Sequence, residues 1–158
     1  MCAPSFSKRF SATEELSIEP GSSIKMNMIN DYDRIWAIRY LREAFAEYHN
    51  GSGTQDQNDE RSLMAMAVRK AQLALQHAFG SPEYLELLIA DAIQTRTTIE
   101  DPMLGLLSTL SLVAKNISEP QMLWSKGSIL RVTKEILEGV STIIREMTST
   151  KNIEAVVD

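Results

Sequence analysis

Residues 101–116 read DPMLGLLSTLSLVAKN, and this stretch decides the fold. Between Pro102 and Ala114 it has no charged side chain, although the chain carries a net charge of −5. A helix with one apolar stripe lies on a surface, whereas a helix that is apolar all round is enclosed by other helices. Small residues in the stretch also let neighbouring helices approach closely. We therefore expect residues of about 102–115 to form the fully apolar central helix of a helical bundle, wrapped by amphipathic helices.

The rest of the chain has the periodicity of such amphipathic helices. Large apolar residues recur at helical intervals in four segments, residues 30–50, 60–79, 82–96 and 129–147. Ser81-Pro82 and Asp101-Pro102 each place a capping residue before a proline, which is a start signal for a helix. No segment alternates polar and apolar residues as a half-buried strand does. The sequence therefore predicts an all-α protein.

One helical domain is expected to account for most of the chain. Its predicted limits are residues 28–148, which is long enough to bury a core. Residues 1–27 show no sustained period, so we expect a flexible N-terminal tail there, and a C-terminal tail at 149–158. Within the domain, residues 50–59 read NGSGTQDQND, and this glycine-rich polar composition predicts a flexible loop.

Composition and charge limit the classes of function. The acidic balance argues against nucleic-acid binding, which a basic surface favours. The single cysteine, Cys2, rules out an internal disulfide and favours a reducing compartment. No secretory signal and no apolar run of about 20 residues is present, so no membrane span is predicted. We expect a cytoplasmic protein.

The sequence lacks the motifs that usually carry catalysis or bind metals. The chain has two histidines, His49 and His77, and with one cysteine they form no zinc ligand set. The glycines match neither a phosphate loop nor a dinucleotide fingerprint, and no nucleophile has a recognisable base. The sequence therefore predicts a protein that is not an enzyme and that has no cofactor and no metal site.

A DNA-binding hypothesis arises from residues 118–137, SEPQMLWSKGSILRVTKEIL. A short helix at 120–124, a break at SKGS and a second helix give the outline of a helix-turn-helix. Glu135 and Glu138 balance the charges of the basic residues in the second helix, so this helix has no basic face. A helix-turn-helix regulator is thus the least favoured of three interpretations.

The order of these segments resembles the Bcl family of apoptosis regulators, which includes divergent viral proteins. RIWAIRYL at 34–41 is similar to the family's first helix, and Ala78-Phe79 is similar to the pair that ends its second helix. Residues 89–116 are similar in spacing to the stretch that runs from the far wall of the family's binding groove into its central helix. The likeness covers about residues 31–147.

The resemblance implies a function and a site. It implies an inhibitor of apoptosis that sequesters the amphipathic death-motif helix of a pro-apoptotic protein in a hydrophobic groove. Arg96 is the nearest candidate for the family's groove arginine, because the motif Asn-Trp-Gly-Arg is missing and IEDP stands in its place. The implied groove residues are Leu75, Ala78, Phe79, Leu85, Leu88, Ala92, Arg96, Leu104 and Gly105.

A second interpretation comes from a different class of protein. A bundle of this composition also suits a self-associating structural protein, such as a viral matrix or scaffold subunit. An unoccupied apolar groove would in addition favour a homodimer under the first interpretation.

Overall fold

The computed structural model of the chain describes residues 30–96, 100–119 and 124–157. These residues form five helices and no strand, which confirms the all-α prediction. The helices are α3 (Asp31–Gly53), α4 (Gln57–Ala78), α5 (Pro82–Thr95), α6 (Pro102–Ser118) and α7 (Lys126–Val157).

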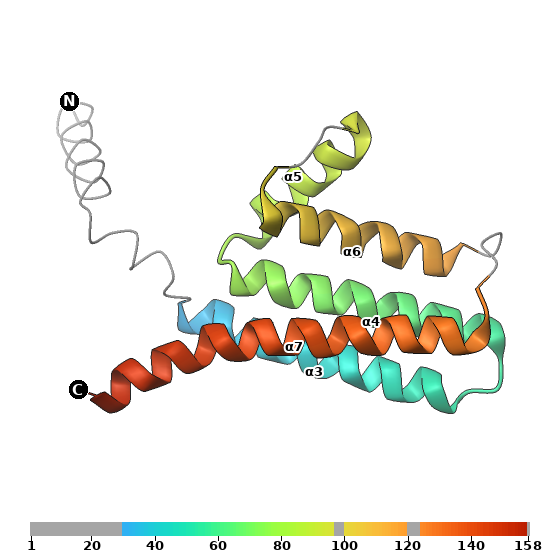
Figure 1. Ribbon diagram of the computed structural model, residues 1–158, viewed down its shortest axis with the longest axis horizontal. Helices are drawn as coiled ribbons and strands as arrows, with labels where there is room; N and C mark the ends of the chain where they lie inside the picture. The colour runs from blue at the N-terminus through green and yellow to red at the C-terminus, as the bar shows by residue number, and fades with distance from the viewer. Residues whose placement is uncertain (1–29, 97–99, 120–123, 158) are drawn as a thin grey trace, which may run out of the picture.

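Helix α4 is the central element of this part of the chain. Helices α3, α6 and α7 lie along it, while α5 stands at an angle at the end where α4 stops and α6 begins (Figure 1). Fully buried side chains recur along α4 on one broad face. They are Met64, Ala67, Val68, Ala71, Ala74, Leu75 and Ala78.

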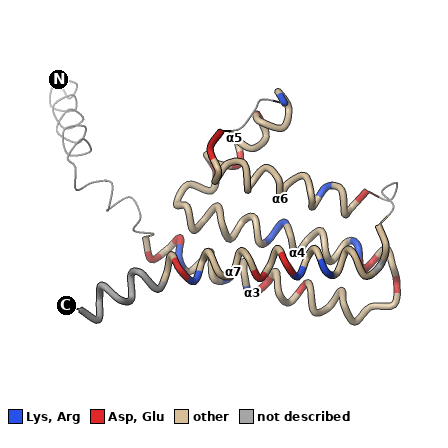
Figure 2. Tube along the Cα trace, viewed as in Figure 1, with Lys and Arg blue, Asp and Glu red and all other residues tan. Residues whose placement is uncertain are grey.

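Helix α6 is not enclosed, so the prediction that residues 102–115 form the central helix is wrong. Leu107, Leu110 and Ile117 are buried against the bundle. On the opposite side, however, Leu112 is 44% exposed. Figure 2 shows that α6 is uncharged over most of its length all the same. An uncharged helix can thus be packed on one side only.

The segment predicted as a flexible loop, residues 50–59, is mostly helical. Helix α3 continues to Gly53, and α4 begins at Gln57 after Asp56, whose carboxylate accepts hydrogen bonds from the Asn58 and Asp59 amides. Gly51 is buried, and a Cβ there would collide with the end of the Met64 side chain. Close packing of the two helices therefore outweighs the weak helix propensity of glycine.

Helix α7 continues past residue 148, where the domain is predicted to end, to Val157. No glycine or proline interrupts the helix after Gly139, and the Thr148 hydroxyl donates to the carbonyl of Ile144 at 2.9 Å. At its other end, α7 already contains Gly127 of the SKGS break. Most of the short helix predicted at 120–124, and the whole N-terminal tail of 1–27, lie outside the described residues.

No helix in the described part of the chain is long and apolar enough to cross a membrane.

Candidate functional site

The groove residues implied by the Bcl resemblance lie at one end of the bundle, but two of them belong to the core. Leu75 and Ala78 of α4 are essentially inaccessible to a partner, at 0% and 1% exposure. Phe79 caps the C-terminus of the same helix and is half-buried.

The other implied residues come from α5 and the start of α6. Leu85, Leu88 and Ala92 of α5 are half-buried, as are Leu104 and Gly105 of α6. Arg96 is exposed and ends α5 in a left-handed conformation, with a φ of 52°. The structure thus brings α4, α5 and α6 together at this end without using all nine residues as surface.

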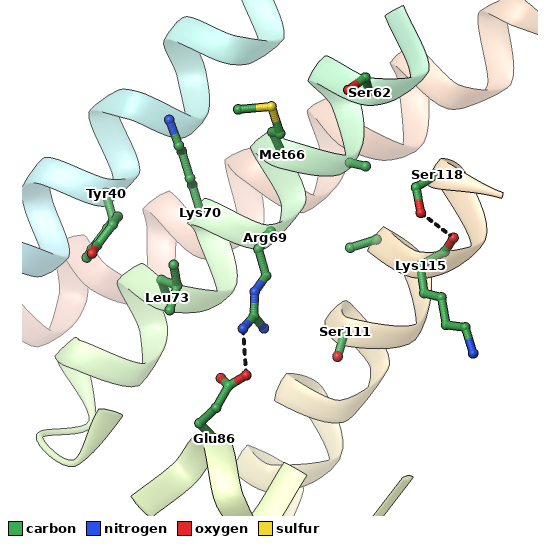
Figure 3. A pocket seen from close by; sticks show the side chains of 12 residues that line it. Tyr40, Ser62, Met66, Arg69, Lys70, Leu73, Glu86, Ser111, Lys115 and Ser118 are labelled. Carbon is green, nitrogen blue, oxygen red and sulfur yellow. Dashed lines mark hydrogen bonds and ion pairs between the residues drawn. The ribbon is translucent and has the colours of Figure 1, made fainter. Parts of the chain in front are cut away.

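Another groove runs along the open face of α4, between α3 and α6 (Figure 3). Its volume is about 740 Å³, and it shares no residue with the implied set. We call it the α4 groove. It is lined by Tyr40, Ser62, Ala65, Met66, Arg69, Lys70, Leu73, Glu86, Ser111, Ala114, Lys115 and Ser118.

The floor and the α6 wall of the α4 groove are made of small and adaptable side chains. Met66 is 43% exposed, and its unbranched thioether can adjust to different partners. Ser111 and Ala114 on α6 leave space beside it, because neither has a long side chain. The groove can therefore admit a large side chain from outside.

Tyr40 forms the α3 wall and is held in a stack of rings. Its ring centroid lies 5.4 Å from that of His77 and 5.8 Å from that of Trp36. His77 is in turn placed by Asp33, whose Oδ1 lies 3.2 Å from its Nδ1. Tyr40 is thus a pre-positioned contact surface, and tyrosine is among the residues that contribute most at protein interfaces.

Arg69 and Glu86 close the end of the α4 groove nearest α5. The Arg69 guanidinium donates to Glu86 Oε1 at 2.5 Å and to Gln72 Oε1 at 3.0 Å. Gln76 donates to the other oxygen of Glu86 at 3.0 Å. Burial alone would raise the pKa of Glu86, but these hydrogen bonds and the Arg69 charge outweigh it and lower that pKa.

Lys70 ties α3 to α4 at the opposite edge. Its ammonium lies 2.6 Å from Glu47 Oε1 and 3.4 Å from Glu43 Oε2. The hydrogen bond with Glu47 raises the pKa of Lys70 against the opposing effect of burial. Lys115 on α6 is 69% exposed, and its ammonium is 3.9 Å from Glu119. On the α6 side the groove therefore presents one basic group, Lys115, toward solvent.

A second groove lies on the other side of α6, between α6 and α7. Its volume is about 310 Å³, and Glu135 is its one charged lining residue. We call it the α6–α7 groove. It is lined by Leu106, Leu110, Val132, Glu135, Ile136, Gly139, Val140 and Ile143.

A sequence signal for the α4 groove exists but is weak. Met66 and Leu73 lie seven residues apart, off the buried stripe of the same helix, so they mark a second apolar face. Such a face is informative only when no other helix covers it, and helix periodicity does not say which faces are covered.

Comparison with protein-family models, with curated proteins and with solved structures finds no match to this chain. Within the described residues, no group of three or more histidine, cysteine, aspartate or glutamate side chains is placed to hold a metal ion.

Proposed function

We propose that this chain is a protein-interaction module that binds an amphipathic helix of a partner protein in the α4 groove. The observation that carries the proposal is an open, preformed groove on the central helix, flanked by two helices and floored by Met66 and Leu73. A helix lying there would complete the ring of helices around α4.

The length of the groove suits three anchors of a bound helix. From Ser62 to Leu73 the floor covers eleven residue steps, or about 17 Å of helix. Residues at i, i+3 or i+4, and i+7 of a partner would contact this length, which is the usual pattern of helix-in-groove recognition. Burial of three large apolar anchors is consistent with submicromolar affinity after the cost of ordering.

The charges of the groove indicate acidic groups on the bound helix. Arg69, Lys70 and Lys115 line the groove, whereas Glu86 is the one acidic lining residue. Arg69 and Lys70 are already paired with Glu86, Glu47 and Glu43, so Lys115, which is 69% exposed, is the basic group that a partner can reach most readily. A partner helix with a carboxylate beside its apolar stripe would meet Lys115 on the α6 wall.

The Bcl resemblance makes the proposal more specific. In that form, the protein is an inhibitor of apoptosis, and the partner is the death-motif helix of a pro-apoptotic protein. The α4 groove differs from the groove that the resemblance implies, so the two sites must be separated by experiment.

The test is a fluorescence titration of the purified protein with death-motif peptides and with unrelated amphipathic helices. Met66→Glu places a charge on the groove floor at an exposed position, so it should weaken binding about tenfold or more without unfolding the chain. Leu112→Glu is the matched control, because Leu112 is equally exposed but lines neither groove. Absence of binding to every peptide, or equal binding by wild type and Met66→Glu, would remove the proposal.

A further inference from the structure

The outer face of α5 carries large apolar side chains that no other helix covers. Leu87 is 71% exposed and Tyr84 is 63% exposed, whereas Ile89, on the opposite side of the helix, is buried. Figure 1 shows that α5 stands at an angle to the other helices, and Ile89 is its one buried residue. An exposed apolar face of this kind, rimmed by polar groups, is typical of a contact site for another molecule.

Two acidic residues flank Leu87 on this face. Glu83, Leu87 and Asp91 follow one another at intervals of four residues, so they form one row along the helix. We call these three residues the α5 row. All three are exposed, and the carboxylates of Glu83 and Asp91 make no hydrogen bond or ion pair with the described part of the chain. The row thus presents a leucine between two unpaired negative charges, which are about 12 Å apart along the helix.

The surroundings of the α5 row are acidic as well. From residue 71 to residue 114 the sequence holds five acidic residues but a single lysine or arginine, Arg96, which lies beyond the last turn of α5. The macrodipole of α5 accounts for Glu83, which is in the first turn, because a negative charge is favourable there. It gives no support to Asp91, which adjoins the last turn. The charge of Asp91 is therefore one that the fold itself does not use.

We propose that the α5 row binds a basic amphipathic helix of a partner protein. A helix with an apolar residue between two lysines or arginines, at i, i+4 and i+7 or i+8, has the matching spacing. It would cover Leu87 and Tyr84 and place one basic group beside each carboxylate of the row. Unlike charges at both ends of a short apolar contact fix where the partner lies along α5, and they exclude acidic helices.

This contact is separate from the α4 groove. Glu86 is the one residue of α5 that lines the α4 groove, and it is not part of the row. The α5 residues of the groove that the Bcl resemblance implies are half-buried on the side of the helix opposite Leu87; they are Leu85, Leu88 and Ala92. The chain can therefore bind a basic helix on α5 whether or not the α4 groove is occupied.

The test is a fluorescence titration of the full chain with an 18-residue amphipathic helix in which lysines flank a stripe of leucines. Leu87→Gln removes the apolar contact and Asp91→Lys reverses one charge of the row, so each should weaken binding about tenfold. Binding to the wild type should also become weaker as the salt concentration rises. Met66→Glu should not weaken it, because Met66 lies in the α4 groove.

Two control variants separate the α5 row from general effects of charge and exposed leucine. Glu138→Lys changes the net charge by the same amount as Asp91→Lys, and Leu112→Gln removes an exposed leucine of α6. Both controls should bind the basic helix as the wild type does. All four substituted positions are exposed, so unfolding followed by circular dichroism should show a folded chain in every case.

Absence of binding by the basic helix, or equal binding by the wild type and both α5 variants, would overturn the proposal. Two other occupants of the row would give different results. Self-association of the wild type in sedimentation equilibrium that Leu87→Gln abolishes would make the row a contact between copies of this chain. Binding to vesicles of anionic lipid that Leu87→Gln abolishes would make it a membrane contact. Either of these results would also overturn the proposal.

Discussion

Two leucines in α6 provide a direct test of how that helix is packed. Leu107 is 0% exposed, whereas Leu112, one and a half turns later, is 44% exposed. Replacement of a buried leucine by alanine leaves a cavity and costs about 3 kcal/mol. At Leu112 about half of the side chain is already in contact with water, and solvent fills the space, so Leu112→Ala should cost about 1 kcal/mol or less.

The assay is urea unfolding and thermal unfolding of Leu107→Ala and Leu112→Ala at one protein concentration, each followed by circular dichroism. In a domain of this size the two changes should lower the melting temperature by about 9 °C and about 3 °C. If α6 were enclosed on all sides, both variants would lose the same free energy of unfolding. Equal losses of about 3 kcal/mol would therefore refute the packing of α6 on one side only.

Two more predictions concern the packing of glycines and the contact that holds α5 against α4. Gly51→Ala should lower the free energy of unfolding by about 1 kcal/mol, because its Cβ would meet Met64 and Leu63. Gly139→Ala should instead raise the free energy of unfolding by about 0.5–1 kcal/mol, because a Cβ there meets nothing. A Gly51→Ala variant that is more stable than the wild type in thermal unfolding would disprove the close contact. The pKa of Glu86 is lower in the folded chain than in the unfolded chain, where it is about 4.3. The Glu86 carboxylate therefore stabilises the packing of α5 on α4 at any pH above about 4.3. This stabilisation is lost as the pH falls through the lower pKa of the folded chain. The protection of the amides of residues 82–95, measured relative to the intrinsic exchange rate at each pH, should therefore fall at acid pH in the wild type. Glu86→Gln should remove most of that pH dependence, and an identical pH dependence in the variant would show that another group controls α5.

The helices could be predicted from sequence, but the choice of central helix could not. Residues 102–115 lack charge, and the absence of charge permits burial on every side without requiring it. Helix α4 is central although it carries Arg69 and Lys70, because both side chains leave the core and pair with Glu86 and with Glu47 and Glu43. The long charged side chains on one face of α4 made its sequence look less buried than that of α6.

Local signals also failed where tertiary packing outweighed them. The glycines of residues 50–59 predict a break, but Gly51 packs closely against Met64 and Leu63 of α4. Asp56 caps the next helix within three residues of the end of α3. Two residues of the predicted groove lie in the core for a related reason. Leu75 and Ala78 belong to the apolar stripe of α4, and a stripe of this kind is core when other helices cover it. The open face of α4 became evident only from the positions of α3 and α6.

The measurement that tests the central claim most directly is a carbon-13 methyl spectrum of the methionine-labelled protein during titration with the tightest-binding helical peptide. Met66 lies in the α4 groove, Met64 is fully buried, and Met103 lies at the start of α6, next to two residues of the groove that the Bcl resemblance implied. Binding in the α4 groove predicts a saturable shift of the Met66 methyl signal, with little change at Met64 and Met103. A shift confined to Met103 would place the partner at the α5–α6 end of the bundle and would contradict the account.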